Sequence, residues 1–264
     1  MKLDNIKIVF IDIDGTLVDD NKNISIATKK TIKRLTDKGI LVVITSGRDL
    51  VHTINRSISS NASSFVIATG GSLIYDYGSN KLLFSDFFDY SKVVSVWNYC
   101  ISNEIGVIIK ATDGVYCNIP SRTEYTYIND ISACKDKQIS QFLIMSDSYD
   151  KMEKVRKHVC DIGMFITSLS SSYLESTDAN YYAIDVNNSN VSKGTAVSLL
   201  LSYLNIKKED SLCFGDYIND IGMFNTCGYR VAMGNACDEI KNISDFVTKS
   251  NNDDGIAYFL DNYL

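Results

Sequence analysis

Five short apolar runs, each followed directly by polar or glycine residues, constrain the fold of this chain more than any other feature. They are rich in β-branched side chains and cover residues 7–11, 40–44, 65–68, 212–214 and 229–233. Apolar runs of this length are typical of strands buried on both faces of a parallel sheet. Helical periodicity occurs between them, at residues 25–38, 192–204 and 218–225. This alternation predicts a doubly wound, Rossmann-like α/β fold.

The middle of the chain has a different pattern, which predicts a second domain. Residues 73–84 read as a hairpin with its turn at 77–80. Beyond it we expect four strands and two helices, at residues 106–110, 141–145, 164–169, 181–186, 90–103 and 150–160. The sequence therefore predicts a core made of residues 1–83 and 186–264, with an α+β domain inserted at 84–185. The aromatic-rich stretch 173–182 is a candidate specificity loop of that domain, and ordinary strand and turn is the alternative.

Composition excludes several classes of protein. The chain has 32 acidic and 26 basic residues and a net charge of −6, which argues against a nucleic-acid partner. No apolar run approaches the ~20 residues that span a bilayer, and Asp12 interrupts the only apolar stretch near the N-terminus. Seven cysteines without a CxxC pair favour reduced thiols over a zinc site. We therefore expect a cytoplasmic protein with no membrane or nucleic-acid partner.

Two carboxylates, Asp12 and Asp14, come directly after the first predicted strand. Carboxylates this close repel each other unless a cation offsets their charge, so Mg²⁺ is the expected partner. Gly15 allows the backbone to approach a ligand closely. The alternatives are a simple polar turn or a calcium loop, although Gly15 directly after Asp14 does not fit the spacing of a calcium loop.

Polar residues also follow the second strand and begin a later helix. Ser46 could donate a hydrogen bond to a phosphoryl oxygen, and Arg48 could hold a phosphate or pair with an acid. A Ser-Gly pair also makes an ordinary turn, which is the alternative for Ser46 and Gly47. Lys193 is predicted at the start of a helix, where its charge opposes the helix dipole. That position suits a lysine with an anionic partner, although a solvated lysine is the alternative.

Three further oxygen-bearing side chains, Asp216, Asn219 and Asp220, follow the strand at 212–214. Such oxygen donors suit Mg²⁺ better than zinc. Asp216 could instead be an ordinary helix cap, but that alternative leaves Asn219 and Asp220 unexplained. In doubly wound sheets, ligands bind at the carboxyl ends of the strands, where all of these residues are predicted to lie.

Taken in order, these motifs resemble the haloacid dehalogenase (HAD) superfamily of phosphatases, and more narrowly its Cof-type branch. The resemblance extends along the whole chain and rests on residues 12–17, 46–48, 191–196, 214–223, 233–236 and 247–257. It implies that the inserted domain is a cap that sets substrate specificity. One departure is Gly70-Gly71-Ser72, where the family often has Asn-Gly-Ala, so this chain lacks any substrate contact made by that asparagine.

The resemblance also implies roles for individual residues. Asp12 would be the nucleophile that forms an aspartyl-phosphate, and Asp14 the general acid and base. Mg²⁺ would be held by Asp12, the backbone carbonyl of Asp14, and Asp216, with support from Asp220. The residues that the resemblance places at the phosphate are Ser46, Lys193, Gly15, Gly47, Arg48 and Asn219.

The predicted function is a Mg²⁺-dependent phosphatase that hydrolyses small phosphomonoesters such as sugar phosphates, nucleotides or pyridoxal phosphate. We expect a monomer or a homodimer. One alternative is a phosphomutase similar to phosphomannomutase, which would need arginines in the inserted domain, where only Arg122 and Arg156 occur. The other is a catalytically silent protein that binds a phosphorylated ligand; loss of Asp12 or Asp14 would mark it, and both are present.

Overall fold

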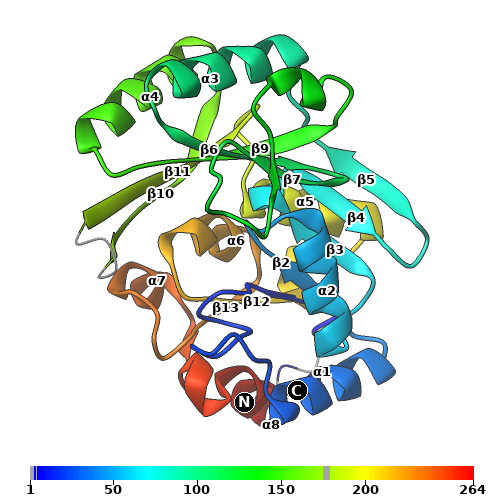
Figure 1. Cartoon of the computed structure of the whole chain (residues 1–264). Coiled ribbons are helices and arrows are strands. Elements are labelled where there is room, and N and C mark those ends of the chain that lie inside the picture. Colours follow the sequence, from blue (N-terminus) through cyan, green and yellow to red (C-terminus); the bar gives the residue numbers. More distant parts are fainter. Residues whose placement is uncertain (1–2, 4, 175–178) are drawn as a thin grey trace. The chain divides into compact units, whose positions relative to one another are not determined.

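The computed structural model describes residue 3 and residues 5–174 and 179–264 (Figure 1). The chain divides into two compact units. The first unit comprises residues 1–48, 52–84 and 192–264, and the second comprises residues 49–51 and 85–191. Each unit has its own sheet and its own buried apolar core.

The first unit is built on an eight-stranded sheet with the strand order β14-β13-β12-β1-β2-β3-β4-β5. Neighbouring strands from β14 to β3 run parallel, and β4 pairs antiparallel with β3. The strands are β1 (Ile8–Ile11), β2 (Leu41–Thr45), β3 (Phe65–Ala68), β4 (Leu73–Asp76), β5 (Lys81–Ser85), β12 (Ser211–Gly215), β13 (Tyr229–Ala232) and β14 (Phe246–Val247). The predicted parallel sheet and the predicted hairpin at 73–84 are therefore both present.

Helices on both sides of this sheet make the unit doubly wound. Figure 1 shows α1 and α8 on one side and α5 and α6 on the other. The helices are α1 (Ile26–Asp37), α2 (Leu50–Ser60), α5 (Lys193–Leu204), α6 (Ile221–Thr226), α7 (Asp238–Ile243) and α8 (Gly255–Tyr263). Short 3-10 turns add η1 (Thr69–Gly71), η3 (Lys208–Asp210), η4 (Ile218–Asp220) and η5 (Asn251–Asp253).

The register of the parallel strands brings the polar strand ends together. Ile11 of β1 lies beside Ile44 of β2 and Phe214 of β12. The chain continues from these three positions into Asp12, Thr45 and Gly215, so the residues that follow emerge at one edge of the sheet. All four residues of β1 are fully buried, which explains why their run is entirely apolar.

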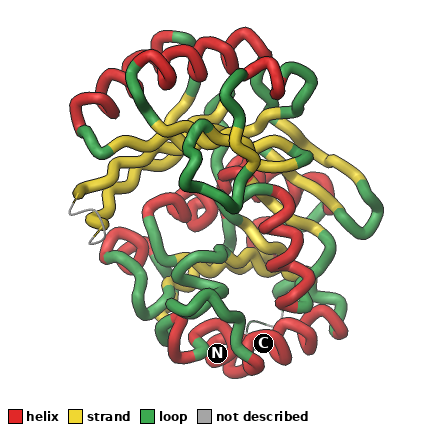
Figure 2. Tube along the Cα trace, viewed as in Figure 1, coloured by secondary structure: helices red, strands yellow, loops and turns green. Residues whose placement is uncertain are grey.

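The second unit has a six-stranded sheet with the order β10-β11-β9-β6-β7-β8. Helices α3 (Tyr90–Ser102) and α4 (Tyr149–Asp161) cover one face of it (Figure 2). That face is apolar, with Trp97 of α3, Phe142 and Val155 of α4 in one buried cluster. The strands are β6 (Gly106–Ala111), β7 (Gly114–Cys117), β8 (Thr126–Tyr127), β9 (Ile139–Ser146), β10 (Phe165–Leu174) and β11 (Ala179–Asn187), with a 3-10 turn η2 (Ile131–Cys134).

Three further sequence predictions concern the candidate specificity loop, membrane-spanning segments and the cysteines. The candidate specificity loop at 173–182 is strand at both ends, and its centre, residues 175–178, lies outside the described part of the chain. Among the described helices, none is long and apolar enough to cross a membrane. All seven cysteines lie in the described part of the chain and are free thiols there.

Candidate functional site

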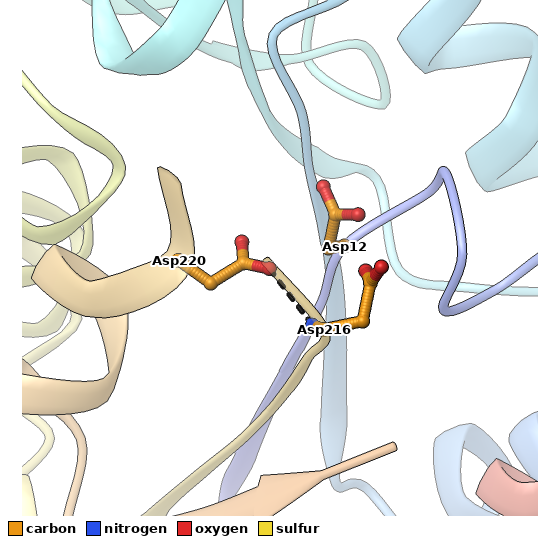
Figure 3. A group of neighbouring side chains, drawn as sticks. All are labelled: Asp12, Asp216 and Asp220. Carbon is orange, nitrogen blue, oxygen red and sulfur yellow. Dashed lines mark hydrogen bonds between the residues drawn. The ribbon is translucent and has the colours of Figure 1, made fainter. Parts of the chain in front are cut away.

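Three carboxylates converge where β1 and β12 end. Asp12 follows β1, Asp216 follows β12, and Asp220 closes the 3-10 turn η4 (Figure 3). One carboxylate oxygen from each lies within 4.8 Å of the others. Asp220 also accepts a hydrogen bond from the backbone N–H of Asp216, at 3.0 Å, so it holds the end of β12 in place. These three acids, which the sequence places after two different strands, are thus brought together.

Lys193 joins this cluster from a different element. Its Nζ donates to Asp12 Oδ1 at 2.5 Å and to Asp220 Oδ1 at 2.7 Å. The lysine is only 2% exposed, while Asp12 is 5% exposed and Asp220 fully buried. Lys193 is therefore a buried ammonium bonded to two buried carboxylates. The alternative of a solvated lysine is wrong.

The local sequence explains why Lys193 begins a helix. Ser192 is the N-cap of α5, and its hydroxyl accepts from the backbone N–H of Thr195 at 3.2 Å. The Thr195 hydroxyl in turn accepts from the N–H of Ser192 at 2.8 Å, which completes a capping box. The cap fixes where α5 starts and hence the direction in which the Lys193 side chain leaves the helix.

The electrostatics of the cluster favour a bound cation. Burial raises the pKa of Asp12 to about 8, and repulsion from Asp220 and Asp216 adds to the rise despite the attraction of Lys193. Burial, followed by repulsion from Asp220, raises the pKa of Asp216 to about 6. When all three carboxylates are ionised, they exceed the single ammonium by two negative charges, and the raised pKa values reflect this repulsion. A divalent cation would balance them, and an all-oxygen donor set suits Mg²⁺.

Asp14 forms ion pairs with two cations. Arg48 donates to it through Nε at 2.8 Å and Nη2 at 2.9 Å, and Lys22 Nζ donates at 3.1 Å. Burial would raise the pKa of Asp14, but hydrogen bonds and charge from Arg48, then Lys22, lower it to about 2. The structure therefore shows Asp14 as an oriented carboxylate, and Arg48 as its partner.

The remaining predicted residues occupy different positions around the cluster. Ser46 is buried, and its hydroxyl accepts from the backbone N–H of Arg48 at 3.1 Å. Gly47 follows in the same loop, with open space where a Cβ would be. Asn219 is an exposed residue of η4. Gly15 is tightly enclosed, because an added Cβ would lie 2.2 Å from Asp216 Oδ2 and its φ is +78°.

Sequence reasoning missed three residues that support the site. The Thr16 hydroxyl donates to Asp216 Oδ1 at 2.8 Å, and Asn235 Nδ2 donates to the carbonyl of Gly15 at 2.8 Å. Lys22, as described above, pairs with Asp14. Thr16 and Asn235 lie within the motifs that carry the resemblance, so their place in those motifs was an available signal. Nothing in the local sequence distinguishes Lys22 from other loop lysines.

Comparison with known proteins decides which family this arrangement belongs to. The family model of haloacid dehalogenase-like hydrolases matches residues 9–260. The chain belongs to this family. A 5-amino-6-(5-phospho-D-ribitylamino)uracil phosphatase of Bacillus subtilis is 28% identical, and the match covers 98% of each chain.

Solved structures of haloacid dehalogenase-like proteins have the same fold as this chain. A haloacid dehalogenase-like hydrolase from Bacteroides thetaiotaomicron superposes with a TM-score of 0.82 at 21% identity, over 97% of this chain and 99% of that one. A HAD subclass IIB sugar phosphatase gives a TM-score of 0.78 at 20% identity, over 97% and 98% of the two chains. The predicted resemblance, fold class and enzyme class are confirmed: this HAD-like hydrolase is a phosphoric monoester hydrolase.

Proposed function

We propose that this HAD-like hydrolase is a Mg²⁺-dependent phosphatase that cleaves small phosphomonoesters through an aspartyl-phosphate on Asp12. The observation that carries the proposal is the buried bridge from Lys193 to Asp12 and Asp220. A carboxylate that attacks an anionic phosphoryl group needs positive charge beside it, and the ammonium of Lys193 supplies part of that charge.

In the first half-reaction, a carboxylate oxygen of Asp12 attacks phosphorus and forms the acyl-phosphate bond. The bond from phosphorus to the leaving oxygen breaks, and that oxygen takes a proton from Asp14. In the second half-reaction, water attacks the same phosphorus. Asp14 accepts a proton from this water, the bond between phosphorus and Asp12 breaks, and inorganic phosphate leaves.

The ion pairs of Asp14 favour the second of these two steps. A carboxyl group with a pKa of about 2 is ionised at neutral pH, which is the form that accepts a proton from water. To donate a proton in the first step, Asp14 must be protonated. Arg48 and Lys22 oppose this, so they must separate from Asp14 when substrate binds. An anionic phosphoryl group is a suitable alternative partner for the Arg48 guanidinium.

The side chains of Asp12 and Asp216 and the backbone carbonyl of Asp14 would hold Mg²⁺, with Asp220 supporting them. When bound, the ion neutralises charge between the carboxylate and the phosphoryl group. Ser46 and Lys193 would orient the phosphoryl oxygens, beside Gly15, Gly47, Arg48 and Asn219. The excess negative charge of the acid cluster supports the assignment of a divalent cation.

We further propose that the second unit is the cap predicted at residues 84–185, and that it selects the substrate. Candidate substrates are sugar phosphates, nucleotides, pyridoxal phosphate and, from the name of the Bacillus subtilis relative, phosphorylated ribityl compounds. The phosphomutase alternative is less well supported. Arg122 pairs with Glu124 at 3.4 Å and Arg156 with Glu153 at 2.7 Å, so acids already partner both arginines of that range.

A panel of small phosphomonoesters tests the proposal by release of inorganic phosphate, with Mg²⁺ and with excess EDTA. Wild type would be compared with Asp12→Ala and with a matched control, Asp261→Ala, whose exposed carboxylate pairs with Arg34. We expect release that needs both Mg²⁺ and Asp12 and that persists in the control. Release by Asp12→Ala at the wild-type rate would exclude the aspartyl-phosphate, and release in EDTA would exclude the metal requirement.

A further inference from the structure

We propose that the turn Thr69–Gly71 is a positioning element that fixes Lys193 relative to Ser46 and Arg48, with Gly71 as its critical residue. This inference rests on the proposed function, because it treats Lys193 and Ser46 as phosphate-binding groups. The turn follows β3 and carries no side chain of the predicted site. The contacts that place it beside the site are backbone contacts.

The backbone of the turn is unusual at three consecutive residues. The φ angles of Thr69, Gly70 and Gly71 are 49°, 67° and 110°. A β-branched residue such as threonine rarely adopts a positive φ, because the conformation is strained. Backbone strain of this kind persists only where the surrounding structure enforces it, and it is concentrated at functional sites.

On one side, the turn holds the loop that follows β2. The N–H of Gly70 donates to the carbonyl of Ser46 at 3.0 Å, and the N–H of Thr69 donates to the carbonyl of Arg48 at 2.9 Å. The turn thereby fixes the backbone on both sides of Gly47.

On its other side, the turn touches the start of α5. A Cβ on Gly71 would lie 2.2 Å from the carbonyl oxygen of Ser192 and 3.1 Å from the nitrogen of Lys193. The same helix start is also close-packed against α6, because a Cβ on Gly194 would lie 2.3 Å from the carbonyl oxygen of Gly222. The backbone on each side of Lys193 is thus packed against backbone of another element at a glycine.

The position of the start of α5 determines whether Lys193 can bridge Asp12 and Asp220. Its Nζ reaches Asp12 at 2.5 Å and Asp220 at 2.7 Å, so a displacement of the helix start by 1 Å would disrupt one or both bonds. Misplacement of a catalytic group by about 1 Å can lower turnover by about 100-fold. A methyl group at residue 71 would overlap backbone atoms of this helix start, so we expect the helix start and the turn to move apart.

The test compares Gly71→Ala with wild type by two measurements, kcat on a small phosphomonoester and the inhibition constant of inorganic phosphate, both with Mg²⁺. We expect kcat to fall about 100-fold and phosphate to inhibit more weakly. The matched control is Gly39→Ala, where φ is +83° and nothing lies within 4 Å of the added Cβ. It introduces the same kind of backbone strain away from the site, so kcat and phosphate inhibition should stay at wild-type values.

A second variant covers the case in which Gly71→Ala does not fold. In Gly222→Ala the new Cβ would lie 3.2 Å from Ser192 Oγ and 3.3 Å from the nitrogen of Gly194, so the displacement of the helix start would be smaller. We expect it to fold and to show a smaller loss of both quantities. A folded Gly71→Ala with wild-type kcat and phosphate inhibition would overturn the inference, and so would a wild-type Gly222→Ala if Gly71→Ala does not fold.

The failure of the proposed function would look different from the failure of this inference. If wild type released no phosphate from any monoester, the phosphatase proposal would fail. Binding of inorganic phosphate, measured by calorimetry, would then still compare Gly71→Ala with wild type. Weaker binding in the variant would support the positioning role, and equal binding would overturn it.

Discussion

Replacement of Asp216 by asparagine tests the charge balance of the acid cluster without a change in side-chain size. Asp216 lies beside Asp220 and accepts a hydrogen bond from Thr16 at 2.8 Å. Burial and the neighbouring carboxylate raise its pKa from the ordinary 3.8 to about 6. The ionised side chain therefore destabilises the metal-free folded state, and Asp216→Asn should stabilise it.

The size of the effect follows from the pKa shift. One pKa unit corresponds to about 1.4 kcal/mol, so a rise from 3.8 to about 6 amounts to about 3 kcal/mol at neutral pH. The Thr16 hydroxyl would donate to an amide oxygen in place of a carboxylate, at a cost of about 1 kcal/mol. We therefore expect Asp216→Asn to raise the free energy of unfolding by about 2 kcal/mol when Mg²⁺ is removed.

The pH dependence gives a second, independent signature. Because the pKa is higher in the folded state, that state binds more protons than the unfolded chain between about pH 4 and 6. Wild-type stability contributed by this group therefore falls as pH rises through that window, whereas Asp216→Asn has no such group. The two proteins should have similar stability near pH 4 and differ most above pH 6.

Urea unfolding in EDTA, at several pH values, measures this difference. Asp245→Asn is the matched control, because its pairing with Arg230 lowers the pKa of Asp245. That control should lose stability above pH 4 where Asp216→Asn gains it. Added Mg²⁺ should stabilise wild type far more than Asp216→Asn. A metal-free Asp216→Asn that is less stable than wild type at pH 7 would refute the reasoning.

Three other substitutions test separate parts of the site and core. Asp14→Asn should release alcohol from an aryl phosphate in a burst and then turn over ~10²–10⁴-fold more slowly, because the second step lacks its base; steady release at the wild-type rate would contradict this. Gly15→Ala should weaken Mg²⁺ binding in calorimetry, since the new Cβ would meet Asp216 Oδ2; an unchanged binding constant would count against it. Phe214→Ala should lower the free energy of unfolding by ~3–5 kcal/mol, because the ring is fully buried against Phe259; a loss under ~1 kcal/mol in urea would show that the cavity had collapsed.

Much of the fold could be predicted because its signals are local. A wholly apolar, β-branched run such as residues 8–11 is typical of a strand buried on both faces, and Ser192 before an apolar helical pattern marks the start of α5. The short strands β7 and β8 were missed, since their partly exposed residues carry no apolar period. The conformation of Thr69 was also missed, because threonine gives no local sign of a positive φ.

The sequence by itself determined which chemical groups this protein has and at which strand or helix end each one lies. Only the tertiary structure decided which of them touch. Lys193 meets Asp12 across 181 residues, and Arg48 meets Asp14 across 34. Those contacts depend on the parallel register of β1, β2 and β12 and on how the start of α5 packs against its neighbours. The spacing of apolar side chains along the chain shows which face of a single helix or strand is buried. Which charged side chains form pairs depends instead on how separate helices and strands pack together.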